Sequence, residues 1–148
     1  LVPDDTNQLT SDHGWDISEL NGENFTSSIT NNCERCSVFI NAGTDLSSLN
    51  NKNINAIEIY TGPYANAHKS GNKELLDKEL KKIIFTAESA REGALRVNAG
   101  HDLDLSNIPL LRECDLIDEV SIGHAIISES LDKGFKTTIR QYIKTING

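Results

Sequence analysis

The sequence predicts an α/β fold built from parallel βα units. Short apolar segments with strand character alternate along the chain with helical stretches. The strand segments are mostly continuous apolar runs, which is typical of strands buried on both faces. The chain has 148 residues, whereas a closed (β/α)₈ barrel needs about 250. The pattern therefore leaves two architectures open, an open α/β sheet or part of a barrel whose other strands lie outside this chain.

Four strands are expected, each followed by turn residues. They cover residues 37–41, 56–60, 95–99 and 119–122. Thr61-Gly62-Pro63 closes the second, Gly100 the third and Gly123 the fourth. Leu1-Val2-Pro3 is interpreted as the remnant of an earlier strand.

Two helices are predicted from apolar stripes with a spacing of three and four residues. The first covers Lys73 to Leu95, with its stripe at Leu76, Leu80, Ile83, Ile84, Ala87, Ala90 and Ala94. The second is C-terminal, with its stripe at Phe135, Ile139, Tyr142, Ile143 and Ile146. Gly134 separates the second from a shorter helix that begins near His124.

Three further helical segments have weaker signals. Glu23 to Cys33 is one, and Asp45 to Asn50 is expected to form one or two turns. In the third, Ser106 is a candidate N-cap and Pro109 sits near the first turn, where its missing N–H is harmless.

Composition restricts the classes of partner. The formal net charge is −8, and the 14 Lys and Arg residues are scattered. Without a basic face, nucleic-acid and anionic-membrane binding are not expected, although backbone N–H groups can still hold a small phosphorylated ligand. No apolar run is long enough to span a membrane, and no signal peptide is evident. The three cysteines leave one unpaired, which favours a reducing, cytoplasmic location. Because Met is absent, even at position 1, the natural N-terminus is expected upstream.

A short repeat marks the expected functional edge. Val97 to His101 and Val120 to His124 share the form Val-x-x-Gly-His and lie 23 residues apart, about one βα unit. Neighbouring parallel strands would place both Gly-His pairs at one edge of the sheet. Ligand and catalytic groups gather at the carboxyl edge in both barrels and open α/β sheets.

The second Gly-His pair predicts a phosphate site. Gly123 allows close approach of a ligand, and a helix beginning at His124 would direct free N–H groups and the positive end of its dipole toward an anion. The alternative is an ordinary strand-to-helix turn.

His101 and Glu58 are candidates for chemistry. A histidine at the end of a strand can exchange protons near neutral pH, and Asp102 and Asp104 lie nearby to tune it. Glu58, between two isoleucines, points to the opposite face from both, so it is either paired or functional. The alternatives are a hydrogen-bonded loop histidine and a structural ion pair.

Cys33-x-x-Cys36 is interpreted as structural or accidental. It lacks a second ligand pair at zinc spacing, and it lies at a helix-to-strand junction rather than at the junction where a thioredoxin-type site occurs.

Taken together, these segments resemble the pyridoxine 5′-phosphate synthase family. The resemblance is strongest at residues 57–65, 97–101 and 122–127, and it extends to Leu1-Val2-Pro3, Leu9-Thr10 and Gly14-Trp15-Asp16. It covers the whole chain but only the C-terminal part of the family, with the three main motifs in the family's order and spacing. It implies that residues 1–148 form the C-terminal portion of one (β/α)₈ TIM-barrel domain, contributing roughly the last four to five βα units.

The resemblance also implies an activity. Enzymes of this family, which are cytoplasmic homo-octamers of vitamin B6 biosynthesis, condense 1-deoxy-D-xylulose 5-phosphate with 3-amino-2-oxopropyl phosphate. The products are pyridoxine 5′-phosphate, inorganic phosphate and water, and no metal or organic cofactor is used. By resemblance, His101 is the proton donor and Glu58 stabilises the transition state. The positions that hold the phosphorylated substrates are Thr10, Asp102, Gly123 and His124, and the family often has glycine at the position of Asp102.

Two other readings stay open. One is a non-catalytic, phosphate-binding half-barrel that pairs with another chain or with a second copy of itself. The other is a different phosphate-handling barrel enzyme that shares only the last two strands.

The isolated 148-residue chain is expected to have at most trace synthase activity. The family's first three strands carry an Asn-Asp-His cluster, a His-Arg pair and a catalytic glutamate, and nothing in this sequence matches them. An assay of the chain with both substrates checks this, with a full-length family enzyme as the control. Turnover at the full-length level would refute the expectation.

Overall fold

The computed structural model describes residues 1–22 and 33–148. Its strands are β1 (Ser37–Asn41), β2 (Ala56–Tyr60), β3 (Arg96–Gly100) and β4 (Glu119–Ser121). Its helices are α1 (Ile17–Leu20), α3 (Gly62–Ser70), α4 (Lys73–Glu92), α5 (Ile108–Arg112), α6 (His124–Lys133) and α7 (Phe135–Asn147). The predicted α/β class is confirmed.

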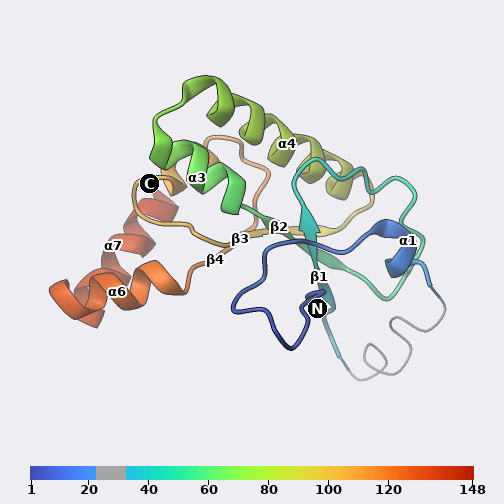
Figure 1. The fold of residues 1–148 in the computed structure, drawn as a ribbon, viewed down its shortest axis with the longest axis horizontal. Helices are drawn as coiled ribbons and strands as arrows, with labels where there is room; N and C mark the ends of the chain where they lie inside the picture. The colour runs from blue at the N-terminus through green and yellow to red at the C-terminus, as the bar shows by residue number, and fades with distance from the viewer. Residues whose placement is uncertain (23–32) are drawn as a thin grey trace.

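The four strands form one parallel sheet in the order β1-β2-β3-β4 (Figure 1). Each strand therefore lies beside the next one in the sequence, and the sheet never reverses its direction of growth. A doubly wound open sheet reverses at a switch point, whereas a barrel adds strands in sequence. The topology is consistent with part of a barrel-like fold, while closure of a barrel and the number of its units remain predictions.

The strand predictions agree closely with the structure. β1 and β2 have the predicted bounds, β3 is shifted by one residue, and β4 ends one residue early. Leu1 is not part of an assigned strand, but its backbone lies beside β1. Its amino group donates to Ser37 O at 2.6 Å, and Phe39 N–H donates to Leu1 O at 2.9 Å. The interpretation of Leu1 as a strand remnant is consistent with this pairing.

The strongly periodic helices are confirmed. α4 begins after Asn72, whose side chain accepts the N–H of Leu75 at 3.1 Å as an N-cap. α6 and α7 are separated by Gly134, which has a φ of +80°. α3 was not anticipated. It starts with Pro63 in its first turn and ends at Gly71, which has a φ of +70°.

The weaker helix predictions fare less well. Residues 45–50 form a turn and not a helix, closed by the hydrogen bond from Leu49 N–H to Leu46 O. Ser106 is not the N-cap of α5, because that helix begins after Asn107. The Ser106 hydroxyl instead donates to the Asp104 carboxylate, a local hydrogen bond that competes with capping of the helix. The helix expected from Glu23 lies in residues 23–32, outside the described residues.

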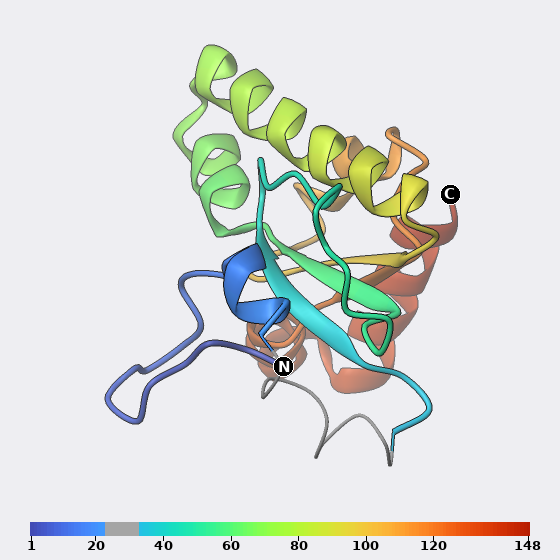
Figure 2. The same cartoon turned by 90° about the vertical axis from the view of Figure 1, so that its right-hand side faces the viewer.

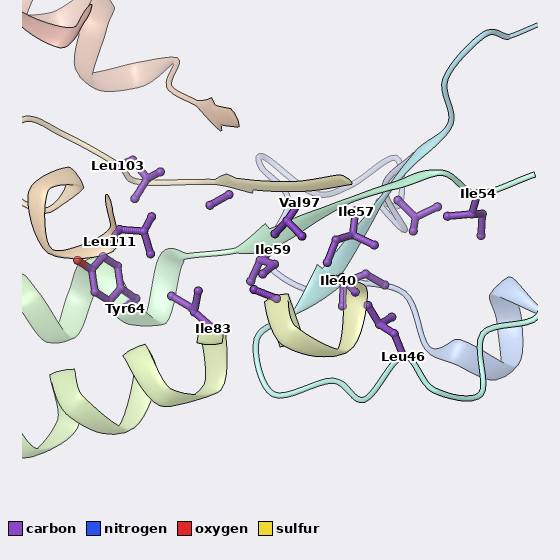
Figure 3. Close-up of a cluster of buried hydrophobic side chains, with 14 of the residues drawn as sticks. Ile40, Leu46, Ile54, Ile57, Ile59, Tyr64, Ile83, Val97, Leu103 and Leu111 are labelled. Atoms are coloured by element: carbon purple, nitrogen blue, oxygen red, sulfur yellow. The ribbon is translucent and has the colours of Figure 1, made fainter. Parts of the chain in front are cut away.

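The hydrophobic core lies between the sheet and one layer of helices. Both views show α3 and α4 on the same face of the sheet (Figure 2). The strands contribute fully buried side chains such as Ile57, Ile59 and Val97, and α4 contributes Ile83 (Figure 3). The opposite face of the sheet is different, because β2 and β3 place Glu58, Tyr60 and Asn98 there. This second face is also largely buried, since Phe39 and Asn98, in register with Glu58, are 4% and 7% exposed. The expectation of strands buried on both faces therefore holds, although the second face is more polar.

Within the described residues, none of the helices combines the length and apolar character needed to span a bilayer.

The free edge of β1 is covered by the N-terminal segment. Gly14 N–H donates to Asn41 Oδ1 at 2.9 Å, and Trp15 N–H donates to Phe39 O at 2.8 Å.

Replacing Gly14 with alanine is expected to destabilise the fold by about 1–3 kcal/mol. An added Cβ would lie 2.5 Å from Asn41 N and 2.5 Å from Ile40 C, which are backbone atoms of the sheet edge. Urea denaturation measures the change. Gly93→Ala is the control, because its Cβ would meet only ordinary contacts of 3.4 Å or more, and we expect a change within about 0.5 kcal/mol. Equal effects of the two substitutions would contradict the prediction.

Candidate functional site

The two Gly-His motifs meet at the carboxyl edge of the sheet. His101 follows β3 and His124 begins α6 after β4. Both line a single cavity of about 670 Å³. The rest of its lining is Thr10 and the other residues of the segments 101–103 and 121–125. The predicted convergence of the two strand ends is therefore present in the structure.

The pairing of the two motifs is offset by two residues. β3 and β4 pair Gly100 with Ser121 and not with Gly123. The second Gly-His pair thus lies beyond the end of its strand, where it can serve as the start of α6. The first pair stays within and directly after its strand.

His101 is surrounded by Thr10, Tyr60 and Asp102. Its Nε2 is 2.9 Å from Thr10 Oγ1, so the N-terminal segment reaches the site. The Tyr60 ring meets the imidazole edge to face, with centroids 5.0 Å apart. Asp102 Oδ2 lies 3.2 Å from Nδ1, in a geometry that leaves Nδ1 without a hydrogen bond. With its side chain 19% exposed, His101 is shielded but accessible from the cavity.

Tyr60 keeps its proton at neutral pH. Burial, aided by the negative charges of Asp102 and Asp12, raises the pKa of its phenol. The ring therefore presents an uncharged edge to His101.

The backbone at His101 and Asp102 adopts the left-handed region. The φ angles are +91° at His101 and +56° at Asp102. Glycine reaches this region at no steric cost, whereas most other residues pay for it and aspartate pays less than most. This conformation explains why glycine suits the position of Asp102 and why aspartate is tolerated there.

Glu58 reaches the same edge from the polar face of the sheet. Its Oε2 accepts a hydrogen bond from Ser121 Oγ at 3.0 Å. An added Cβ on Gly100 would collide with the Glu58 carboxylate. Glu58 and His101 also line a smaller cavity of about 160 Å³. Among residues 1–22 and 33–148, the partner of this carboxylate is thus a hydroxyl and not a cation.

Gly123 and His124 are exposed, at the N-terminus of the ten-residue helix α6. Gly123 has an ordinary φ of −108°, and an added Cβ would meet no atom within 4 Å. Neither backbone strain nor packing within the described residues requires glycine at this position. The helix directs its first N–H groups and the positive end of its dipole to this end.

The cysteine pair takes no part in this site. Cys33 is exposed and Cys36 is buried, and both are free thiols. Burial raises the pKa of Cys36, which opposes the thiolate that redox chemistry or metal binding needs. Among residues 1–22 and 33–148, no cluster of His, Cys, Asp and Glu has an arrangement suited to a metal ion.

Sequence reasoning missed the residues that hold the site together. Thr61 Oγ1 lies 2.7 Å from Gly100 O and 2.6 Å from His101 O, and donates its proton toward them. Asn107 Nδ2 donates to Asp102 O at 3.1 Å. Both residues stand at the N-cap of a helix, which is the role that their local sequence indicates.

A parallel sheet with ionisable side chains gathered at its carboxyl edge defines the class. The chain is an α/β protein of sequential βα units with a cavity at the carboxyl ends of its strands, which is where enzymes of sequential βα units carry their sites. A family described as Pyridoxal phosphate biosynthesis protein PdxJ matches residues 1–148, and the chain belongs to this family.

Curated relatives agree with this assignment. Pyridoxine 5′-phosphate synthase of Chelativorans sp. (strain BNC1) is 40% identical over 97% of the chain and 59% of its own length. The synthase of Xanthomonas oryzae pv. oryzae (strain MAFF 311018) is 38% identical over 100% of the chain and 58% of its own length. That of Cytophaga hutchinsonii is 38% identical over 99% and 61%. The chain thus spans about three-fifths of the length of these relatives.

Asp104 provides a pH-dependent support for the loop after His101. Its Oδ1 accepts from Ser106 N–H at 2.8 Å, Ser106 Oγ at 2.6 Å and Asn107 N–H at 3.1 Å. Burial alone would raise the pKa of Asp104, but these hydrogen bonds outweigh it and lower the pKa below its ordinary value of 3.8.

Because the folded-state pKa of Asp104 is depressed, its contribution to stability is present above pH 3.8 and is lost as the pH falls below that value. Asp104→Asn is expected to cost about 1 kcal/mol at pH 7 and less at pH 3. Urea denaturation at several pH values measures the difference. Asp132→Asn, an exposed carboxylate on α6, is the control, and a pH-independent cost of Asp104→Asn would contradict the prediction.

Proposed function

We propose that this chain supplies part of the active site of a pyridoxine 5′-phosphate synthase. The reaction would condense 1-deoxy-D-xylulose 5-phosphate with 3-amino-2-oxopropyl phosphate, giving pyridoxine 5′-phosphate, inorganic phosphate and water. The observation that carries the proposal is the shared cavity of His101 and His124 at the carboxyl edge of the sheet, in a chain of this family.

The anionic substrates would be held at the α6 end of the cavity. Here Gly123 gives room for close approach and His124 adds an imidazole donor beside the helix N-terminus. Thr10 and Asp102 both line the same cavity, and Thr10 also contacts His101. These two residues would complete the binding of the phosphorylated substrates. The expected partners are thus small phosphorylated molecules, with no role for nucleic acid or a membrane.

His101 would act as the proton donor. Joining an amine to a ketone and closing a ring require several proton transfers and losses of water, and an imidazole is suited to them near neutral pH. Glu58 would stabilise positive charge that develops in the transition state, since its carboxylate faces the same edge. The segment with Thr10 already contacts His101, so it is the candidate lid that excludes water.

The main alternative is a non-catalytic half-barrel that binds phosphate and pairs with another chain. The observation that favours it is the exposed apolar surface of α6 and α7. Its members are Ile127, Leu131, Phe135 and Ile143, which are 53–84% exposed. In the synthase reading, the same surface would face a neighbouring part of the full-length protein or of its homo-octamer.

The substitution His101→Asn separates the two readings, in a chain completed with its upstream strands. The synthase reading predicts a loss of kcat of about 10²–10⁴-fold, with binding of inorganic phosphate retained. Steady-state kinetics and calorimetric titration with phosphate provide the measurements. His68→Asn, on α3, is the matched control and is expected to leave kcat unchanged. Unchanged turnover of the His101 variant would refute the proposed role, and phosphate binding without any turnover of the parent would favour the half-barrel.

A further inference from the structure

The turn after β3 holds two non-glycine residues in the left-handed region. These are His101 and Asp102, with φ angles of +91° and +56°. Such backbone strain persists only where surrounding contacts outweigh it, and it gathers at functional sites. Contacts that fix this turn are therefore also contacts that fix the direction of the His101 side chain.

Three consecutive carbonyl groups of this turn accept side-chain hydrogen bonds. The Thr61 hydroxyl donates toward Gly100 O and His101 O, at 2.7 and 2.6 Å. The Asn107 amide donates to Asp102 O at 3.1 Å. Thr61 and Asn107 are buried, with exposed fractions of 0% and 2%. A buried donor or acceptor that loses its hydrogen-bond partner lowers the stability of the fold, so these hydrogen bonds are costly to break.

Both donors are diverted from the task that their position suggests. Thr61 is the N-cap residue of α3 and Asn107 that of α5, yet neither side chain caps its own helix. At an N-cap, Thr and Asn ordinarily accept an N–H of the first helical turn. Here each side chain donates to the His101 turn instead, and the backbone N–H of Thr61 adds a fourth hydrogen bond to the turn, to Gly100 O at 2.9 Å.

The consequence is a fixed imidazole. With its backbone held, the His101 ring lies between Tyr60, whose ring centroid is 5.0 Å away, and the Thr10 hydroxyl, 2.9 Å from Nε2. Its position places it in the wall of the 670 Å³ cavity.

We propose that Thr61, assisted by Asn107, is a positioning residue that holds His101 in its strained backbone conformation and so directs the imidazole into the cavity. The catalytic meaning of this role rests on the proposed function. The positioning itself does not, since it can be measured without substrate.

The test compares Thr61→Val, Thr61→Ser and Thr86→Val in the full chain. Valine keeps the size of threonine but removes the hydroxyl, and serine restores it. Thr86 is the matched control, because it is also buried and its hydroxyl also bonds to a loop carbonyl, Thr44 O at 3.0 Å, away from this site. Two readouts are used: the imidazole ¹H–¹⁵N spectrum of His101, and its rate of modification by diethyl pyrocarbonate, followed at each histidine by peptide mass spectrometry.

For Thr61→Val we expect a changed imidazole spectrum and a rate of His101 modification raised at least about fivefold. Thr61→Ser and Thr86→Val should behave like the parent chain at His101. An unchanged rate in Thr61→Val, an equal rise in Thr86→Val, or a failure of serine to restore the parent rate would each overturn the proposal.

If Thr61→Val does not fold, Asn107→Asp supplies the test. Aspartate keeps the acceptor oxygen that bonds Asp104 N–H at 2.9 Å but loses the donor to Asp102 O. A rise in the His101 rate supports the proposal, and the parent rate overturns it. In the completed enzyme, Thr61→Val should lower kcat far more than it raises KM. An enzyme without synthase activity would refute the proposed function while leaving the imidazole readouts intact.

Discussion

The Glu58 side chain of β2 can extend over β3 toward β4 only because β3 has a glycine, Gly100, at the point that it passes. A Cβ on Gly100 would collide with the carboxylate, which passes this point to accept the Ser121 hydroxyl on β4. Gly100 is not needed for an unusual turn, since it is not among the residues with positive φ. The glycine of the first Val-x-x-Gly-His motif therefore leaves room for a side chain of another strand. The hydrogen bond from Ser121 to Glu58 then links β4 to β2 over β3.

The parts of the structure that depend on local patterns could be predicted from the sequence. The long stripe of α4 and the apolar runs of β1 and β2 determine their own bounds, because burying one face requires that spacing. The convergence of His101 and His124 also follows from pattern, since parallel strands end at a common edge. By contrast, α3 buries small residues such as Gly62 and Ala67, which carry little periodic signal, so only its Pro63 and Gly71 mark it.

The details of the site depend on contacts between distant segments. Thr61 and His101 are separated by 40 residues, and the sequence around Thr61 indicates only a strand end or a helix cap. No local pattern shows that its hydroxyl bonds across to the next strand end. The left-handed backbone of His101 is equally hidden, because the modest enrichment of histidine at positive φ does not mark any single position. The Ser106 cap was wrong for a local reason instead, since Asp104, two residues earlier, accepts the Ser106 hydroxyl and two backbone N–H groups of the same turn.

The polar face of the sheet favours a barrel interior over an open sheet. A doubly wound sheet carries helices on both faces and needs apolar side chains on both. β2 instead alternates, with Ile57 and Ile59 toward α4 and Glu58 on the other side. The polar groups there have partners: Glu58 has Ser121, and Arg35 bonds both Asn98 Oδ1 at 2.9 Å and Glu119. Unpaired polar groups would be costly inside a closed barrel, so this pairing agrees with the proposal that this face lines a barrel interior, with His101 and its cavity at the carboxyl edge.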